Sequence, residues 1–188
     1  MIFYLHGFNS APASHKARTL KGYMEAHGLG HLFACPALAH RPQEAVRTIE
    51  AGVAGRAVTF VGSSLGGFYA TYFAEKHGCR AVLIQPATRP YAGLQSMLGP
   101  QQNLYTGERY DLTREHLEGW RALAVERIDP ERYLLLIETG DEVLDWREAA
   151  RKYEGARMVI RQGGDHTLRC FPEQIPRILA FAGIVPQA

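Results

Sequence analysis

Short apolar runs alternate along this chain with segments in which apolar residues recur every three or four positions. The runs are at most five residues long, are rich in Val, Ile, Leu, Phe or Tyr, and cover residues 1–5, 57–61, 81–84, 133–137 and 158–160. Strands that are covered on both faces lose the alternation of polar and apolar residues, so these runs predict buried strands. A weaker strand is expected near residues 31–34.

The intervening segments predict helices. One helix is indicated by apolar residues at i, i+3, i+4, i+7 and i+8, which are Leu65, Phe68, Tyr69, Tyr72 and Phe73. Gly78 is suited to end that helix in the left-handed conformation. Further helical patterns cover residues 17–24, 42–49, 117–124, 149–153 and 178–182. Pro176 is expected to break any longer helix begun at Pro172, because proline lacks the amide hydrogen and clashes with the preceding turn.

Alternating strands and helices predict a parallel sheet with right-handed crossovers, and hence a single three-layer α/β domain over residues 1–188. Residues 86–111 do not follow this alternation, although they contain Tyr91, Met97, Leu98, Leu104 and Tyr105. A connection of that length is usually functional or mobile. We expect a lid or a wall of a substrate pocket, and the alternative is an irregular connection packed on the surface.

Composition narrows the function classes. The chain has 188 residues, of which 46% are hydrophobic and 21% charged, which excludes intrinsic disorder. Its net charge is +2 and its basic residues are scattered, so we expect no nucleic-acid partner. No apolar stretch is long enough to cross a bilayer, and no basic region precedes the apolar residues 1–5 as in a signal peptide.

Three widely spaced cysteines without a CxxC pattern are typical of reduced, buried thiols in a cytoplasmic protein. The eight histidines show no metal-binding spacing, and we expect no cofactor.

A Gly-x-Ser-x-Gly motif lies between a predicted strand and a predicted helix, at Gly62, Ser64 and Gly66. A nucleophile elbow needs this context, because its serine sits on a sharp strand-to-helix turn that exposes the hydroxyl above the sheet. Side chains two positions either side of the serine would collide in such a turn. The motif therefore predicts Ser64 as a nucleophile. Ser63 is a rival that lacks the glycine spacing, and the alternative for both is a role as helix N-cap.

A serine nucleophile needs a histidine base that is oriented by an acid. Two later predicted strands run into Gly-Asp and Gly-Gly-Asp-His, which end at Asp141 and His166. The order Ser, Asp, His is that of α/β-hydrolases, and all three residues follow the carboxyl ends of strands, where parallel sheets place their ligands. We predict Asp141 as the acid and His166 as the base. Asp145 and Asp165 are rival acids, and Asp141 as a helix N-cap is the alternative.

The first predicted strand ends in His-Gly-Phe-Asn-Ser at residues 6–10. Acyl transfer requires two backbone amides that face the oxygen which becomes negative. The predicted oxyanion hole consists of the amides of Phe8 and Leu65, and the alternative for residues 6–10 is a simple turn. Asn9 is expected to give its side-chain amide to the substrate or to the loop. Tyr91 and Tyr105 are candidates for the substrate pocket, or else part of a packed loop.

Five segments together resemble the small bacterial esterases of the YqiA type, which belong to the α/β-hydrolase superfamily. They are His-Gly-Phe-Asn-Ser at 6–10, Gly-Ser-Ser-Leu-Gly-Gly at 62–67, Tyr-Thr-Gly-Glu at 105–108, Gly-Asp-Glu-Val-Leu-Asp at 140–145 and Gly-Gly-Asp-His at 163–166. The resemblance spans nearly the whole chain. It implies a serine esterase that uses Ser64, His166 and Asp141, on a fold trimmed to about six strands without a large cap. The chain departs from the expected pattern at Gln85, where an asparagine would precede the proline.

The resulting hypothesis is hydrolysis of a small-molecule ester or thioester through an acyl-serine intermediate, without metal or cofactor. An acyltransferase or a peptidase would use the same three residues, and products formed with added alcohol or amine would identify either. A non-catalytic binding protein on a hydrolase scaffold is the alternative from another class. It would bind its ligand after loss of Ser64 and turn over no ester.

Overall fold

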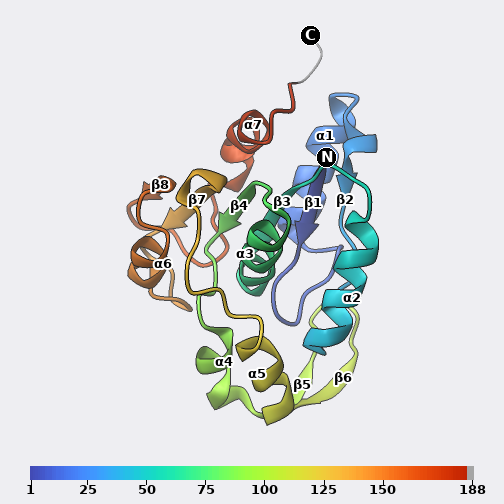
Figure 1. The fold of residues 1–188 in the computed structure, drawn as a ribbon, viewed down its shortest axis with the longest axis vertical. Coiled ribbons are helices and arrows are strands. Elements are labelled where there is room, and N and C mark those ends of the chain that lie inside the picture. Colours follow the sequence, from blue (N-terminus) through green and yellow to red (C-terminus); the bar gives the residue numbers. More distant parts are fainter. Residues whose placement is uncertain (186–188) are drawn as a thin grey trace.

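A computed structural model describes residues 1–185, and its centre is a six-stranded parallel sheet in the order β2-β1-β3-β4-β7-β8 (Figure 1). The strands are β1 (Ile2–Leu5), β2 (Phe33–Ala34), β3 (Thr59–Ser63), β4 (Ala81–Ile84), β7 (Tyr133–Glu138) and β8 (Arg157–Arg161). Each predicted run forms a strand of this sheet, with ends that move by up to two residues. The weaker prediction at residues 31–34 corresponds to the two-residue strand β2.

Helices cover both faces of the sheet and complete the three predicted layers. One face packs against α1 (His15–Ala26) and α7 (Phe171–Phe181). The other packs against α2 (Pro42–Val53), α3 (Leu65–His77) and α6 (Trp146–Lys152). Helix α5 (Arg114–Arg121) adds Leu117 and Trp120 to the edge of the same core. Alternate residues of one strand enter the two cores, as β1 illustrates with Phe3 in one and Tyr4 in the other. This two-sided burial explains why the strands appear in the sequence as continuous apolar runs.

Helix α7 corrects one prediction, because it continues through Pro176 instead of ending there. Pro172 occupies the first turn, where the amide would have no partner in any case. Pro176 removes one hydrogen bond of the helix. The buried side of α7, which includes Phe171, Ile175 and Ile178, packs on the sheet and outweighs that local cost.

Residues 86–111 are organised, and they fall into two parts. The first contains the short helices α4 (Pro90–Gly93) and η2 (Gln95–Met97), and the second is an antiparallel hairpin of β5 (Gly99–Gln102) and β6 (Arg109–Leu112). Together with α5 they lie beyond one end of the main sheet (Figure 1). Two other short 3₁₀ turns, η1 (Gly30–Leu32) and η3 (Pro130–Arg132), precede strands of the main sheet.

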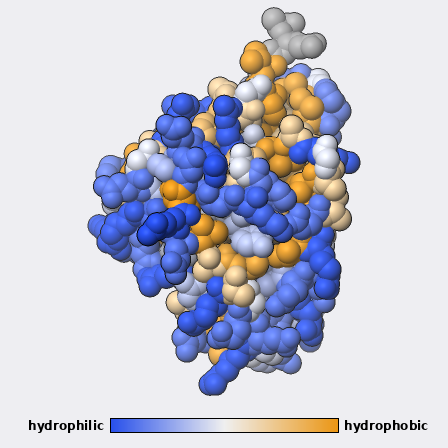
Figure 2. Space-filling model, viewed as in Figure 1, coloured by the Kyte–Doolittle hydropathy of each residue, from blue (hydrophilic) through white to orange (hydrophobic). Residues whose placement is uncertain are grey.

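The surface is hydrophilic over most of the face seen in Figure 2, including the lower part, where β5, β6, α4 and α5 lie. Apolar residues reach this face mainly in its upper and middle parts. Among residues 1–185, no helix is both long enough and apolar enough to span a bilayer.

Candidate active site

Ser64 occupies the sharp turn between β3 and α3, with φ 55° and ψ −120°. A residue other than glycine with positive φ is strained at a cost of about 1–3 kcal/mol, so its surroundings must hold it in place. Its amide donates to the carbonyl of Ile84 at 3.0 Å, and its own carbonyl accepts from the amides of Gly67 at 2.9 Å and Ala87 at 3.1 Å. The predicted nucleophile thus has the geometry of an elbow, held from β4 and from α3.

The glycines around Ser64 are required by close contacts between backbones. A Cβ atom on Gly62 would lie 2.3 Å from the carbonyl oxygen of Gly66, and one on Gly66 would lie 1.9 Å from that of Leu5. A Cβ on Gly7 would be 3.3 Å from the Cβ of Ser64. Strand β1, the loop that follows it and the start of α3 therefore meet at the serine with no room for side chains.

Asp141 and His166 lie together on the loops after β7 and β8. Oδ2 of Asp141 is 2.8 Å from Nδ1 of His166, and this carboxylate side chain is 1% exposed. Its other oxygen accepts from the amides of Val143 at 2.8 Å and Leu144 at 2.9 Å. A carboxylate with these partners accepts a hydrogen bond from Nδ1–H and leaves Nε2 of His166 as the unprotonated nitrogen that can act as a base.

The rival residues have other partners. Asp145 is the N-cap of α6 and accepts from the amide of Arg147 at 3.0 Å. Asp165 accepts from the amide of Thr167 at 2.9 Å and from Arg169 at 2.5 Å. Ser63 is buried as the last residue of β3. None of these three side chains contacts His166 through a hydrogen bond in the described part of the chain.

A buried carboxylate that the sequence analysis missed holds the histidine loop. Glu138, which is 4% exposed, accepts from the amides of Asp165 at 3.1 Å, Arg169 at 3.3 Å and Cys170 at 3.4 Å. Burial raises the pKa of Glu138. Hydrogen bonds from Cys170, Asp165 and Arg169 together lower the pKa by more than burial raises it, so the net pKa lies below its ordinary value. A glutamate at the end of an apolar run has no local signal for this role.

Two further side chains support the same loop. Oε2 of Glu142 accepts from the amide of His166 at 3.0 Å. Nε2 of Gln85 donates to the carbonyls of Glu138 and Asp165, both at 3.1 Å, from a backbone with φ 43°. Gln85 is the position that departs from the expected family pattern, and nothing in the sequence linked that departure to the histidine loop.

The predicted oxyanion donors lie on either side of Ser64. Leu65 is the first residue of α3, and Phe8 follows Gly7 in the loop after β1. Neither of these two backbone amides donates a hydrogen bond within residues 1–185. The first amides of a helix are unpaired and carry its positive dipole end, which favours a developing negative charge there.

A cavity of about 560 Å³ brings these groups together, since Ser64, His166, Phe8 and Leu65 all line it. Ser64 lines this space, and its hydroxyl makes no hydrogen bond within the described residues. The remaining wall is mainly apolar. It comes from the start of residues 86–111 and from the loop after Asp141, with Ala87, Pro90, Ala92, Leu94, Met97, Val143 and Leu144, besides the ion pair of Arg89 and Glu148 at 2.6 Å.

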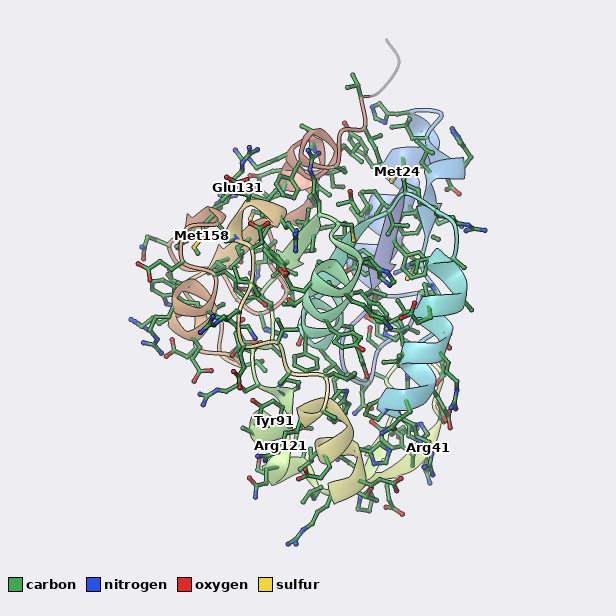
Figure 3. All side chains as sticks on the ribbon, viewed as in Figure 1. Met24, Arg41, Tyr91, Arg121, Glu131 and Met158 are labelled. Carbon is green, nitrogen blue, oxygen red and sulfur yellow. The ribbon has the colours of Figure 1, made fainter. Side chains whose placement is uncertain are left out.

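The structure does not bring the other predicted substrate residues to this cavity. Tyr91 faces a neighbouring cavity and lies beside Arg121 (Figure 3), whose guanidinium is 5.0 Å from its ring centre. Tyr105 is 49% exposed in the turn of the hairpin. Asn9 binds residues of the hairpin through its side chain. Side-chain direction in an irregular segment depends on distant contacts, which the sequence pattern does not report.

The cysteines are free and are poor candidates for a nucleophile. Burial raises the pKa of Cys35 to about 12, that of Cys79 to about 11 and that of Cys170 above its ordinary value. Only Cys170 is fully buried, whereas Cys35 and Cys79 are half-buried. No group of three or more metal-ligating side chains occurs among the described residues.

Three solved structures illustrate what this chain resembles. A protein from Agrobacterium vitis S4 superposes with a TM-score of 0.75 at 18% identity, over 96% of this chain and 87% of that one. Mouse alpha/beta hydrolase domain-containing protein 10 gives 0.70 at 17%, over 95% and 89%. A structure from the work on the metagenome-derived lipolytic enzymes LipS and LipT gives 0.70 at 18%, over 97% and 92%. At these identities the likeness shows the α/β-hydrolase fold alone.

The model of the uncharacterised protein family UPF0227 matches residues 1–183. That match covers almost the whole chain, and it agrees with the resemblance carried by the five sequence segments. This protein therefore belongs to UPF0227, the YqiA-like family, and has the α/β-hydrolase fold.

Proposed function

We propose that this protein is a serine hydrolase that cleaves carboxylic ester or thioester bonds. One observation carries the proposal. Ser64 sits in a strained elbow at a cavity of about 560 Å³, and the same cavity is lined by His166, whose Nδ1 is bound by the buried Asp141. The acyl carbon of a substrate in this cavity would have a nucleophile, a base and two unpaired amides within one space.

In the first half of the proposed reaction, the hydroxyl of Ser64 rotates to donate to Nε2 of His166. Its oxygen attacks the acyl carbon while Nε2 takes the proton, and Asp141 stabilises the imidazolium that forms. The carbonyl oxygen becomes negative and accepts from the amides of Phe8 and Leu65. The tetrahedral intermediate then breaks its bond to the leaving oxygen or sulfur, which receives the proton from His166.

In the second half, water takes the place of the leaving group. His166 removes one proton from this water, and the resulting hydroxyl group bonds to the acyl carbon. The bond between the carbon and Oγ of Ser64 breaks, and the serine recovers its proton from His166. Each turnover consumes one water and yields one carboxylic acid and one alcohol or thiol.

The apolar cavity wall supports a substrate with an apolar acyl group. Leu94, Met97, Val143 and Leu144 come from two different loops and leave space for a chain of several methylene groups. Transfer of apolar surface into such a pocket gains about 0.8 kcal/mol for each methylene group. Activity on p-nitrophenyl esters is therefore expected to rise with acyl length until the cavity is full.

The proposal is tested by labelling with a fluorophosphonate probe and by hydrolysis of p-nitrophenyl butyrate. We expect wild type and Ser63→Ala to be labelled and active, and Ser64→Ala to lose both properties. If Ser63→Ala lost the labelling and Ser64→Ala were still labelled, the nucleophile would be Ser63 and the proposed assignment would be wrong. A folded wild type that is neither labelled nor active would favour a binding protein on a hydrolase scaffold.

The cavity wall gives a second test. Leu94→Trp fills part of the cavity, so the preferred acyl chain should become shorter by a few carbons. The value of kcat/KM should fall by about tenfold or more for p-nitrophenyl octanoate and stay unchanged for p-nitrophenyl acetate. Leu98→Trp is the matched control, because Leu98 is a neighbouring apolar residue that does not line the cavity. An unchanged chain-length profile in Leu94→Trp would place the acyl group elsewhere.

A further inference from the structure

The loop that contains Phe8 is bound by a segment that lies about a hundred positions later in the sequence. We refer to residues 6–10 as the oxyanion loop and to residues 99–112, which contain β5 and β6, as the hairpin. Both contain a segment that the family resemblance singled out, and the proposed reaction uses only the first of them. The contacts between them suggest what the second segment does.

Asn9 is bound to the hairpin at three of its atoms. Its Oδ1 accepts from the hydroxyl of Tyr110 at 2.7 Å, and its Nδ2 donates to Oε1 of Gln101 at 3.1 Å. Its backbone carbonyl accepts from the amide of Leu104 at 3.1 Å. Both ends of this side chain are thus engaged by protein partners, so Asn9 has a role in holding the loop and not in contacting substrate.

The turn of the hairpin adds a fourth contact. Nδ2 of Asn103 donates to the carbonyl of Ser10 at 2.8 Å. Its Oδ1 accepts from the amides of Tyr105 at 2.9 Å and Thr106 at 3.0 Å, which fixes the turn itself. One asparagine therefore joins the fold of the hairpin turn to the position of the oxyanion loop.

The backbone of Asn9 needs such support. Its φ is 50°, in the left-handed region that asparagine tolerates better than most residues but that still costs energy. Phe8, the preceding residue, packs edge-on against Trp120 with ring centres 6.4 Å apart, and His40 stacks on Tyr110 at 4.1 Å. A small cavity of about 30 Å³ lies where the loop, the hairpin, His40 and Trp120 meet. The hairpin therefore fits closely against the loop.

The other end of the loop is held separately. Nε2 of His6 accepts from the amide of Leu38 at 3.0 Å, and its Nδ1 lies 3.1 Å from the carbonyl of Gly7. A neutral ring with the proton on Nδ1 satisfies both bonds, and burial lowers the pKa of His6, which keeps the ring neutral. The amide of Phe8 thus lies between two anchored points, one at His6 and one at Asn9.

We propose that the hairpin positions the oxyanion hole, with Asn9 and Tyr110 as positioning residues that hold the amide of Phe8 at the place where negative charge develops. This inference rests on the proposed function. An oxyanion donor acts only within about 2.7–3.1 Å of the anion, and a displacement of about 1 Å can cost about 100-fold in rate. A hairpin bound to the loop at four points restricts such displacement.

Three variants separate this role from a general effect on folding. Asn9→Gly keeps a backbone that accepts positive φ and removes both side-chain bonds. Tyr110→Phe removes one hydroxyl and retains the aromatic ring that stacks on His40. Arg109→Ala is the control, because Arg109 is the exposed neighbour of Tyr110 and its side chain makes no hydrogen bond or ion pair within residues 1–185.

The measurements are kcat and KM for p-nitrophenyl butyrate and the inhibition constant of butylboronic acid, whose tetrahedral adduct with serine imitates the anionic intermediate. We expect kcat to fall about tenfold in Tyr110→Phe and up to about 100-fold in Asn9→Gly, with KM within about twofold of wild type. The inhibition constant of the boronic acid should rise by the same factor by which kcat/KM falls. The double variant should match Asn9→Gly alone, since both changes remove the same bond.

Wild-type kcat in both Asn9→Gly and Tyr110→Phe would overturn the proposal, and so would a loss of kcat without weaker binding of the boronic acid. Failure of the proposed function is a different outcome, recognised by a folded wild type that neither hydrolyses esters nor reacts with fluorophosphonate. In that case amide hydrogen exchange of residues 7–10 decides. Faster exchange in Tyr110→Phe than in Arg109→Ala would support the hold of the hairpin on the loop, and equal exchange would overturn it.

Discussion

The two sides of the candidate active site are held in place by different physical means. On the side of Ser64, backbone atoms of β1, β3 and α3 approach so closely that a single Cβ at Gly66 would lie 1.9 Å from the carbonyl oxygen of Leu5. On the acid and histidine side, Asp141, Glu138 and Glu142 accept hydrogen bonds from backbone amides. Close glycine contacts occur there too, since a Cβ on Gly140 would lie 2.4 Å from the carbonyl oxygen of Gly164 and one on Gly164 would lie 2.0 Å from Oε2 of Glu138. The hydrogen-bonded carboxylates are therefore what distinguishes this side from the other.

The two sides should therefore respond differently to a change in pH. Contacts between uncharged backbones do not depend on pH, so the elbow of Ser64 should keep its shape as long as the protein is folded. The loop that carries His166 depends on ionised carboxylates and should loosen when these become protonated. Added volume at the tightly packed glycines should damage either side, whereas loss of charge should damage only the second.

The largest effect is expected from Gly66→Ala. The added methyl group forces α3 away from β1. Overpacking typically costs about 1–3 kcal/mol of unfolding free energy and occasionally more, and a clash with backbone is expected at the upper end of that range. Urea denaturation followed by circular dichroism measures this loss, together with any loss of soluble protein. Stability equal to wild type would mean that the elbow is not held by this close approach.

The next largest effect is expected from Glu138→Ala. This change leaves the amides of Asp165, Arg169 and Cys170 without their acceptor, at a cost of about 2–3 kcal/mol, and Glu138→Gln should lose about half as much. Hydrogen exchange should accelerate at residues 165–170 before it changes in β3. Glu173→Gln is the control, since Glu173 is 68% exposed and its ion pair with Arg161 is worth less than about 1 kcal/mol. Equal exchange in all three variants would contradict the role of Glu138.

A smaller effect is expected from pH. The pKa of Glu138 is lower in the folded protein than its ordinary value near 4.5, so its stabilising contribution is present above pH 4.5 and is lost as the pH falls through the lowered value. The stability difference between wild type and Glu138→Gln should therefore shrink as the pH falls below 4.5. Denaturation curves between pH 7 and about pH 3 measure it. A difference that grows in acid would contradict the sign.

The smallest effect has the opposite sign and sharpens the comparison. Gly22 lies in the middle of α1, where a Cβ would meet nothing within 4 Å. Gly22→Ala should therefore stabilise the protein by up to about 1 kcal/mol, because alanine has the higher helix propensity. The same substitution would then stabilise at one glycine and destabilise at another. A loss of stability in Gly22→Ala would show that glycine in this fold matters for reasons other than contact.

The sequence alone was enough to predict the features of this protein that depend on local pattern. Runs buried on both faces identified the strands, and a glycine-flanked serine between a strand and a helix identified the elbow of Ser64. Asp141 and His166 follow strands at the same edge of a parallel sheet, so a general rule of topology brought them near each other before any distance was known. Their bond at 2.8 Å is what that rule led us to expect.

Tertiary structure decided which distant side chains meet. Asn9 was a candidate for substrate or loop, and its partners Tyr110 and Gln101 lie 101 and 92 positions later, beyond the reach of any periodic pattern. Glu138 directly follows an apolar run, and its role depends on a loop that begins after the next strand. A helix break at Pro176 was predicted from local sterics, but packing of α7 against the sheet outweighs the local cost of the proline. Local propensities act over a few residues, whereas these outcomes depend on contacts that form only when the whole sheet has assembled.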